Sequence, residues 1–146
     1  MTSQEFKDHI AKKYSGGYKN SAQLTNAIIG YLNNTGWFVW RSNTVGIFDI
    51  KIFAQKLKAL QSVTSSGALT AAKASYRKTH DLKGAPDILG YHKQTGLFIG
   101  VEVKFGKDTM SSDQNSFKYY ADKSKAVYIV AKSLADVIDR LNNNLK

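Results

Sequence analysis

Two apolar runs joined by a short polar loop constrain the fold more than any other stretch of this chain. The first run lies in residues 84–91 and the second in residues 97–105, with the polar residues 93–96 between them. A short polar loop that ends in glycine is typical of the connection between antiparallel strands. The sequence therefore predicts a β-hairpin in the C-terminal half of the chain.

The second strand of this hairpin carries two charged residues among apolar ones. Because side chains alternate along a strand, Glu102 and Lys104 share one face. Ionised groups on a strand suited to burial are costly unless they are paired, hydrogen-bonded or bound to a metal. Asp87, which follows Pro86, lies near Glu102 if the strands pair, and two converging carboxylates repel each other unless a cation lies between them. An exposed Glu102–Lys104 pair on a solvated face, with Pro86 and Asp87 in a simple turn, explains the spacing equally well.

The order of apolar patterns along the chain predicts an α/β domain with a central mixed β-sheet flanked by helices. Ser21 is expected to be the N-cap of the second helix, and the apolar run at 126–131 to form a central buried strand. Residues 62–67 are expected to be turn-like or flexible. Helices are expected at residues 3–14, from 21 to a glycine cap at 36, at 51–61, at 68–76, from 111 and from 133, with a strand at 37–40.

A formal net charge of +10 indicates a polyanionic partner. Excess positive charge attracts polyanions through steering and counterion release, so nucleic acid is the first candidate. An anionic membrane surface is the competitor, but no segment combines a basic face with a strongly apolar one, and we expect no membrane partner. The chain has no cysteine, which excludes disulfides and thiolate metal sites and fits a reducing compartment such as the cytoplasm.

Basic residues supply the candidate contacts to nucleic acid. The lysine-rich stretch between Lys51 and Lys83 is the best candidate for a DNA clamp or a dimer contact, although a solvated face explains any single lysine. Arg41 follows the expected strand at 37–40 and either pairs with a carboxylate or contacts a phosphate. The residues expected to bind nucleic acid are Arg41, Lys83, Lys107 and Lys118.

Short motifs in the C-terminal half resemble the core of the PD-(D/E)XK nuclease superfamily. Their order is Gly84, Pro86-Asp87, Glu102-Val103-Lys104 and residues 111–114. They look most like the small VRR-NUC and Holliday-junction-resolvase-like nucleases of phages and bacteria. The resemblance covers about residues 76–141 and, more weakly, residues 20–43. It implies a restriction-endonuclease-like fold, with residues 1–146 as a single nuclease domain that carries a basic excursion at about 50–80.

The resemblance implies metal-dependent hydrolysis of a DNA phosphodiester. Asp87, Glu102 and the backbone carbonyl of Val103 would hold Mg²⁺ or Mn²⁺, because hard oxygen ligands suit these ions. Lys104 would orient or help activate the attacking water and stabilise the transition state. Gln114, which relatives place beside the carboxylates, would position Lys104, water or phosphate. The series 111–114 also matches a capping box, so a helix-capping role for Gln114 is expected beside the site role.

The first core helix departs from the family pattern. Many relatives carry a metal-binding glutamate there, whereas residues 20–26 contain no acid. Gln23 and Asn20 are the candidate substitutes, and the number of metal ions, one or two, stays open.

The expected function is that of a Mg²⁺-dependent endodeoxyribonuclease that selects branched DNA such as Holliday junctions. We expect a homodimer in a bacterial or phage-infected cell, because a four-way junction offers two related strands to a two-fold pair of sites. An exonuclease or a restriction-like nuclease is the alternative within the same chemistry. A DNA-binding module that keeps the fold without catalysis is the alternative from another class, and the missing helix glutamate is its best support.

Overall fold

The computed structural model describes residues 2–42, 47–48, 50–60, 64–73, 75–77 and 83–144. Contacts divide the chain into two compact units, one formed by residues 1–43 with 82–146 and the other by residues 44–81. The basic excursion that the sequence places at about 50–80 falls within the second unit. None of the helices in the described ranges is long and apolar enough to cross a membrane.

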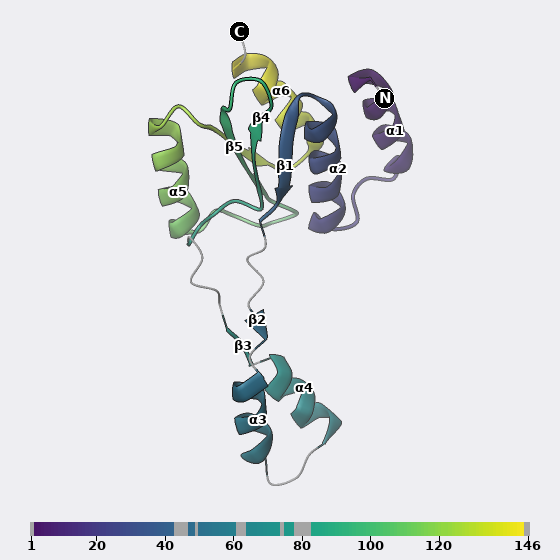
Figure 1. The fold of residues 1–146 in the computed structure, drawn as a ribbon. Coiled ribbons are helices and arrows are strands. Elements are labelled where there is room, and N and C mark those ends of the chain that lie inside the picture. The colour runs from purple at the N-terminus through teal and green to yellow at the C-terminus, as the bar shows by residue number, and fades with distance from the viewer. Residues whose placement is uncertain are drawn as a thin grey trace. The chain divides into compact units, whose positions relative to one another are not determined.

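A four-stranded mixed sheet forms the centre of the first unit (Figure 1). Its spatial order is β1 (Trp37–Arg41), β4 (Ile88–His92), β5 (Phe98–Val103) and β6 (Val127–Ala131). β1, β4 and β5 are antiparallel, whereas β6 runs parallel to β5. The hairpin of β4 and β5 confirms the prediction from the two apolar runs. The unit therefore belongs to the α/β class.

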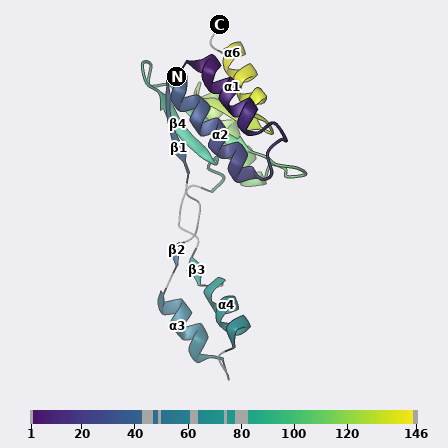
Figure 2. The same cartoon turned by 90° about the vertical axis from the view of Figure 1, so that its right-hand side faces the viewer.

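Helices cover both faces of this sheet. On one face, α1 (Ser3–Lys13), α2 (Ser21–Asn34) and α6 (Leu134–Asn144) enclose the apolar core (Figure 2). The predicted helical spacing is confirmed, because the fully buried residues Leu24, Ile28 and Leu32 of α2 pack in this core with Val101 of β5. On the other face, α5 (Ser112–Lys123) packs near β6, where the rings of Phe117 and Tyr128 lie 5.9 Å apart.

β6 is buried, but the prediction of a central strand is wrong. Among the described strands it pairs with β5 alone and ends the sheet. Its residues are withdrawn from water because α5 and α6 pack against its two faces, rather than because strands flank it on both sides. A continuous apolar run reports burial on both faces and carries no information about which strands lie beside it.

The capping residues correct the sequence prediction at one helix and confirm it at another. α2 begins after Asn20, whose side chain accepts a hydrogen bond from the Gln23 N–H, so the N-cap is Asn20 and the prediction of Ser21 is wrong. Both residue types accept such a bond equally well, so sequence preference cannot separate neighbours. The predicted cap at Ser133 is confirmed, since its hydroxyl accepts a bond from the Asp136 N–H.

The second unit contains two helices and a short strand pair among its described residues: α3 (Ile50–Lys58), α4 (Ser65–Lys73), β2 (Ile47–Phe48) and β3 (Tyr76–Arg77). The turn expected up to residue 67 ends earlier, because the Thr64 hydroxyl accepts a hydrogen bond from the Gly67 N–H and starts α4. The helix expected to reach Tyr76 stops at Lys73, and Tyr76 pairs with Phe48 instead. The remaining expectations at 61–63 lie outside the described residues.

The outer edge of β1 is satisfied by a side chain of α2. Asn33 donates to the Val39 carbonyl over 3.1 Å and accepts from the Val39 N–H over 3.0 Å. These are two of the bonds that a further strand would make, so Asn33 both blocks the edge and fixes α2 on β1.

We expect Asn33→Ala to lower the free energy of unfolding by about 2 kcal/mol, because it leaves both polar groups of Val39 without partners in a partly buried position. Asn34→Ala is the matched control, since Asn34 is exposed and its side-chain amide donates to the Gly30 carbonyl of its own helix. Urea unfolding of the two variants beside the parent protein measures the difference. Equal stability of both variants would contradict the clamp.

Candidate active site

The register of the hairpin brings the two predicted carboxylates together. Ile88 lies opposite Val101, and just beyond this pair the Asp87 Oδ2 accepts a hydrogen bond of 2.9 Å from the Val103 N–H. Asp87 and Glu102 also line the same cavity. The expectation that Asp87 approaches Glu102 is therefore confirmed.

Glu102 and Lys104 form a buried ion pair. Their exposed fractions are only 2% and 4%, and the Lys104 Nζ lies 3.0 Å from the Glu102 Oε1. The alternative of an exposed pair on a solvated face is therefore wrong. The Glu102 Oε2 is also buried, and among the described residues it has no hydrogen-bond partner.

Gln114 connects these two charges. Its Nε2 donates to the Glu102 Oε1 over 2.5 Å, and its Oε1 accepts from the Lys104 Nζ over 2.9 Å. The same Oε1 accepts from the Ser111 N–H, and the Ser111 hydroxyl accepts from the Gln114 N–H. The predicted capping box is confirmed, and one amide both starts α5 and reaches the ion pair.

Gly84 fixes the position of α5 relative to the motif that contains Asp87. Its φ is +78°, and a Cβ at this position would lie 2.1 Å from the Asp113 carbonyl oxygen and 2.7 Å from the Gln114 nitrogen. A residue with a side chain would therefore displace the first turn of α5. The backbone contact at Gly84 keeps Gln114 within reach of Glu102.

One of the three N–H groups of Lys104 has no acceptor within hydrogen-bonding distance among the described residues. A protonated lysine has three N–H donors, and Glu102 and Gln114 accept two of them. The Oδ2 of Asp108, the second acidic neighbour of Lys104, lies 3.6 Å from the Nζ, beyond hydrogen-bonding distance. Lys104 can therefore donate to a further oxygen without losing its present contacts.

A cavity of about 430 Å³ opens over these groups. Ser21 and Thr25 of α2 form one side of it, and neither was expected from the sequence. The buried Thr25 hydroxyl donates to the Ser21 carbonyl, so the two residues lie one turn apart. The residues that line the cavity are Ser21, Thr25, Arg41, Asp87, Glu102, Val103, Lys104, Asp108, Thr109, Ser111 and Gln114.

The candidate substitutes for the missing helix glutamate point elsewhere. Asn20 caps α2, and the Gln23 side chain accepts a hydrogen bond from the Lys19 N–H. Neither residue lines the cavity. The expectation for Asn20 and Gln23 is therefore wrong, because both side chains are used by the turn that begins the helix.

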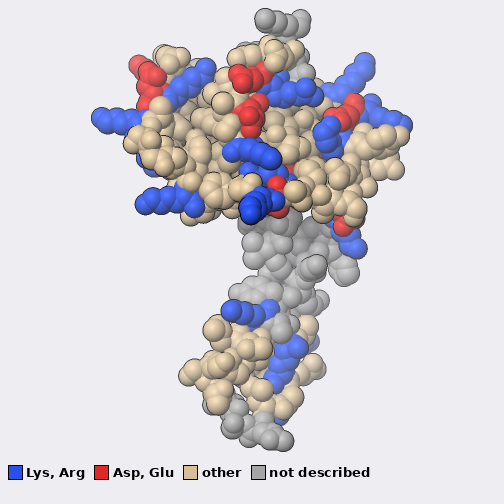
Figure 3. All heavy atoms as spheres, turned by 180° about the vertical axis from the view of Figure 1, so that it is seen from behind, with Lys and Arg blue, Asp and Glu red and all other residues tan. Residues whose placement is uncertain are grey.

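The four residues expected to bind nucleic acid have different surroundings. Arg41 lines the cavity, and its Nη2 donates to the Asn26 Oδ1 over 3.2 Å and to the Ala22 carbonyl over 3.4 Å. Within the described part of the chain, no carboxylate pairs with Arg41. Lys83 borders a separate apolar cavity, Lys107 is exposed in the loop after β5, and Lys118 pairs with Asp122 one turn along α5. On the face of the first unit seen in Figure 3, basic side chains are spread out rather than gathered in one patch.

Burial raises the pKa of Glu102 to about 7 from its usual 4.5. The hydrogen bond and the charge of Lys104 lower it, while the charges of Asp87 and Asp108 raise it further. Burial also raises the pKa of Tyr128, and the charge of Glu102 adds to that effect. The Tyr128 hydroxyl, like the Glu102 Oε2, is buried and has no partner among the described residues.

The donor set at this cavity fits a hard divalent cation. The described residues contain no group of three or more His, Cys, Asp or Glu side chains placed to hold a metal. Two carboxylates with a backbone carbonyl are nevertheless the kind of oxygen set that Mg²⁺ shares with several waters. The unpartnered Glu102 Oε2 is the observation that supports this fit, because a buried carboxylate oxygen without a donor is costly unless a cation balances it.

The pKa of Glu102 makes the stability of the metal-free protein depend on pH. The folded chain binds this proton more tightly than the unfolded chain, so the stabilisation is complete below pH 4.5 and is lost as the pH rises through about 7. Glu102→Gln removes this dependence. As the pH rises from 4.5 to 7.5, the free energy of unfolding of the variant should therefore increase relative to that of the parent by up to about 3 kcal/mol.

Urea unfolding in EDTA at the two pH values measures this difference. Asp139→Asn, which changes an exposed carboxylate of α6, is the matched control and should show no such trend. A constant difference between Glu102→Gln and the parent would show that Glu102 ionises normally.

Comparisons with other proteins add no family to this picture. No family model matches the chain, and no match is found among curated proteins or solved structures. The chemistry open to the cavity therefore follows from the positions of Asp87, Glu102, Lys104 and Gln114 themselves.

Proposed function

We propose that this chain is a metal-dependent DNA endonuclease with a restriction-endonuclease-like fold, and that it hydrolyses phosphodiester bonds at the cavity over Asp87 and Glu102. The observation that carries the proposal is the buried Glu102–Lys104 pair with an unpartnered carboxylate oxygen beside Asp87. Stability alone does not favour this arrangement, because burying two charges costs about as much as their attraction returns. Branched DNA is the proposed substrate, and a homodimer is the proposed active state.

Asp87, Glu102 and the carbonyl of Val103 would hold Mg²⁺ or Mn²⁺. The ion, when bound, would lower the pKa of a water and neutralise charge on the phosphoryl oxygens. The N–H of Val103 restrains the side chain of Asp87. Lys104 and Gln114 restrain the side chain of Glu102. The oxygens are therefore held in place before any ligand arrives, which is how preorganised sites reduce the cost of binding.

Lys104 acts on the substrate through its third N–H. It donates to the scissile phosphate or to the attacking water, and its positive charge stabilises the negative charge of the transition state. Gln114 holds the ammonium group in one direction over 2.9 Å. Arg41, whose exposed guanidinium lines the same cavity, supplies a contact to a neighbouring phosphate.

Substitution of the site residues tests this function. Asp87→Asn and Glu102→Gln should each lower the rate of nicking of a supercoiled plasmid in Mg²⁺ or Mn²⁺ by 10³-fold or more, an order-of-magnitude expectation for removal of a metal ligand. Lys104→Ala should lower it by roughly 10²-fold or more, because it removes a donor to the transition state.

Asp139→Asn should cut like the parent protein, since Asp139 is exposed on α6 and does not line the cavity. Circular dichroism and thermal unfolding of each variant check that the fold is retained. Normal nicking by a folded Asp87→Asn or Glu102→Gln protein would refute the assignment.

A DNA-binding module without catalysis is the second candidate. The α2 side of the cavity presents the hydroxyl residues Ser21 and Thr25 where an acid would complete a second metal site, and this observation favours it. Such a module binds DNA with the same residues but leaves the plasmid intact with every divalent metal.

Binding to DNA should weaken steeply with salt in both cases. On duplex DNA, the logarithm of the binding constant falls with the logarithm of the salt concentration, with a slope of about −0.9 for each phosphate neutralised. Arg41→Ala should make this slope less steep by roughly the contribution of one phosphate. Lys12→Ala is the control, because Lys12 is exposed on α1 and does not line the cavity. Anisotropy titrations in EDTA at several salt concentrations give the slopes. An affinity independent of salt would show that the basic surface has no role in binding.

A further inference from the structure

Four aromatic side chains lie on one face of the sheet, and we refer to them as the aromatic row. Phe38 and Trp40 come from β1, Tyr91 from β4 and Phe98 from β5. Phe38 lies opposite Tyr91, and Tyr91 lies opposite Phe98, so the row crosses three strands. The ring centroids of Phe38 and Tyr91 are 5.5 Å apart, and those of Phe38 and Trp40 are 6.0 Å apart.

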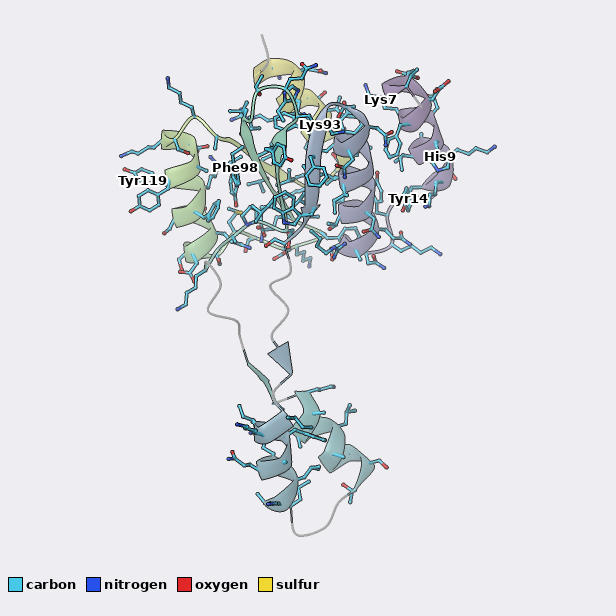
Figure 4. All side chains as sticks on the ribbon, in the orientation of Figure 1. Lys7, His9, Tyr14, Lys93, Phe98 and Tyr119 are labelled. Carbon is cyan, nitrogen blue, oxygen red and sulfur yellow. The ribbon has the colours of Figure 1, made fainter. Side chains whose placement is uncertain are left out.

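These rings are exposed, which is unusual for side chains that touch one another on a sheet. Their exposed fractions run from 38% for Phe98 to 49% for Phe38. α5 covers the β6 side of this face, and Figure 4 shows Phe98 between α5 and the other strands. A contiguous exposed apolar patch marks a binding surface more often than a solvent-facing one.

The aromatic row shares its face with the carboxylates of the cavity. Phe98, Gly100 and Glu102 are every second residue of β5 and therefore share one face of the sheet. Phe98 is four residues from Glu102, which is about 13 Å at 3.3 Å per residue. On β1, Trp40 is followed two residues later by Ser42, whose N–H donates to the Asp87 carbonyl over 2.8 Å. One ligand can therefore reach both places along the same strands.

The charges around the row fit a polyanion. Glu102 is the only acidic residue in β1, β4 and β5, and it lies at the cavity. The exposed Lys83 lines the apolar cavity that Phe98 also lines, on the α5 side of the row. A surface that combines exposed rings with a neighbouring cation is the kind that stacks the bases of single-stranded nucleic acid. A duplex cannot use it in this way, because its base faces are already stacked on one another.

We infer that the aromatic row binds unpaired bases of the DNA whose backbone enters the cavity at Asp87 and Glu102. This rests on the proposed function and narrows its substrate to DNA with a single-stranded segment beside the cleavage position, such as a flap or an opened junction arm. Phe98 also lines an apolar cavity of about 530 Å³ with Phe117 and Tyr120, so the stacking surface continues toward α5.

Binding in EDTA tests the inference without requiring cleavage. The probes are a fluorescent 20-nucleotide oligo(dT), an abasic oligonucleotide of the same length, and a 20-base-pair duplex. The parent protein should bind oligo(dT) roughly tenfold or more tightly than the abasic strand, since the two carry the same phosphates and differ only in bases. Equal affinity for these two strands would overturn the inference.

Trp40→Ala and Phe38→Ala should weaken oligo(dT) binding by roughly tenfold and duplex binding by less than about twofold. Trp40→Phe keeps a ring and should retain most of the affinity. Tyr119→Ala is the matched control, because Tyr119 is 54% exposed on the outer side of α5, away from the row (Figure 4). An equal loss for both DNA forms, or a change in sedimentation with unaltered DNA binding, would assign the row to another contact and overturn the inference.

Cleavage separates this inference from the proposed function. If the chain cuts DNA and the row selects unpaired bases, the parent protein prefers a flapped substrate to a blunt duplex, and Trp40→Ala loses that preference while still cutting duplex. Stacking of oligo(dT) without any cleavage would support the inference and refute the nuclease proposal. Cleavage with unchanged flap preference in Trp40→Ala would refute the inference and leave the nuclease proposal intact.

Discussion

The contact between Glu102 and Lys104 joins two opposite charges that are both withdrawn from water, and the positions of the neighbouring elements depend on it. Removing one partner of such a pair typically costs 3–5 kcal/mol, because the other charge is left buried alone. Gln114 satisfies both charges at once, so α5 must begin where its amide can reach β5. Gly84 then fixes the same turn from the other side, since only a residue without a side chain fits against Asp113. The strand, the helix and the motif around Asp87 are thereby held in one arrangement.

Local patterns in the sequence were sufficient for the elements whose signal is local. The hairpin followed from its two apolar runs, and α2 from the spacing of Leu24, Ile28 and Leu32, because period and turn chemistry are properties of neighbouring residues. The position of β6 in the sheet could not be obtained in this way. An apolar run reports that both faces are covered, and only long-range packing decides whether helices or strands lie beside it. The choice between Asn20 and Ser21 as cap failed for a simpler reason, since both are good acceptors.

Local sequence patterns likewise predicted some residues of the candidate site and not others. The closeness of Asp87 to Glu102 and the capping role of Gln114 could be predicted, because the first follows from strand pairing and the second from a motif of four residues. Ser21 and Thr25 could not, since they lie beside the core face of α2 and become part of a cavity only when the helix is placed over the strand ends. The aromatic row is visible in the sequence only as alternation in three separate strands. The register of those strands is what aligns Phe38, Tyr91 and Phe98.

The pairing of Arg41 with Ile88 has a consequence for how this chain can change length. These residues are direct neighbours in the ladder of β1 and β4, and the Ser42 N–H donates to the Asp87 carbonyl just beyond them. The Cα atoms of Arg41 and Ile88 are therefore roughly 5 Å apart, although residues 44–81 lie between them in the sequence. Every described residue that lines the cavity belongs to residues 1–43 or 82–146. A shorter connection between β1 and β4 that keeps residues 83–87 would therefore leave the four-stranded ladder and the described lining of the cavity in place.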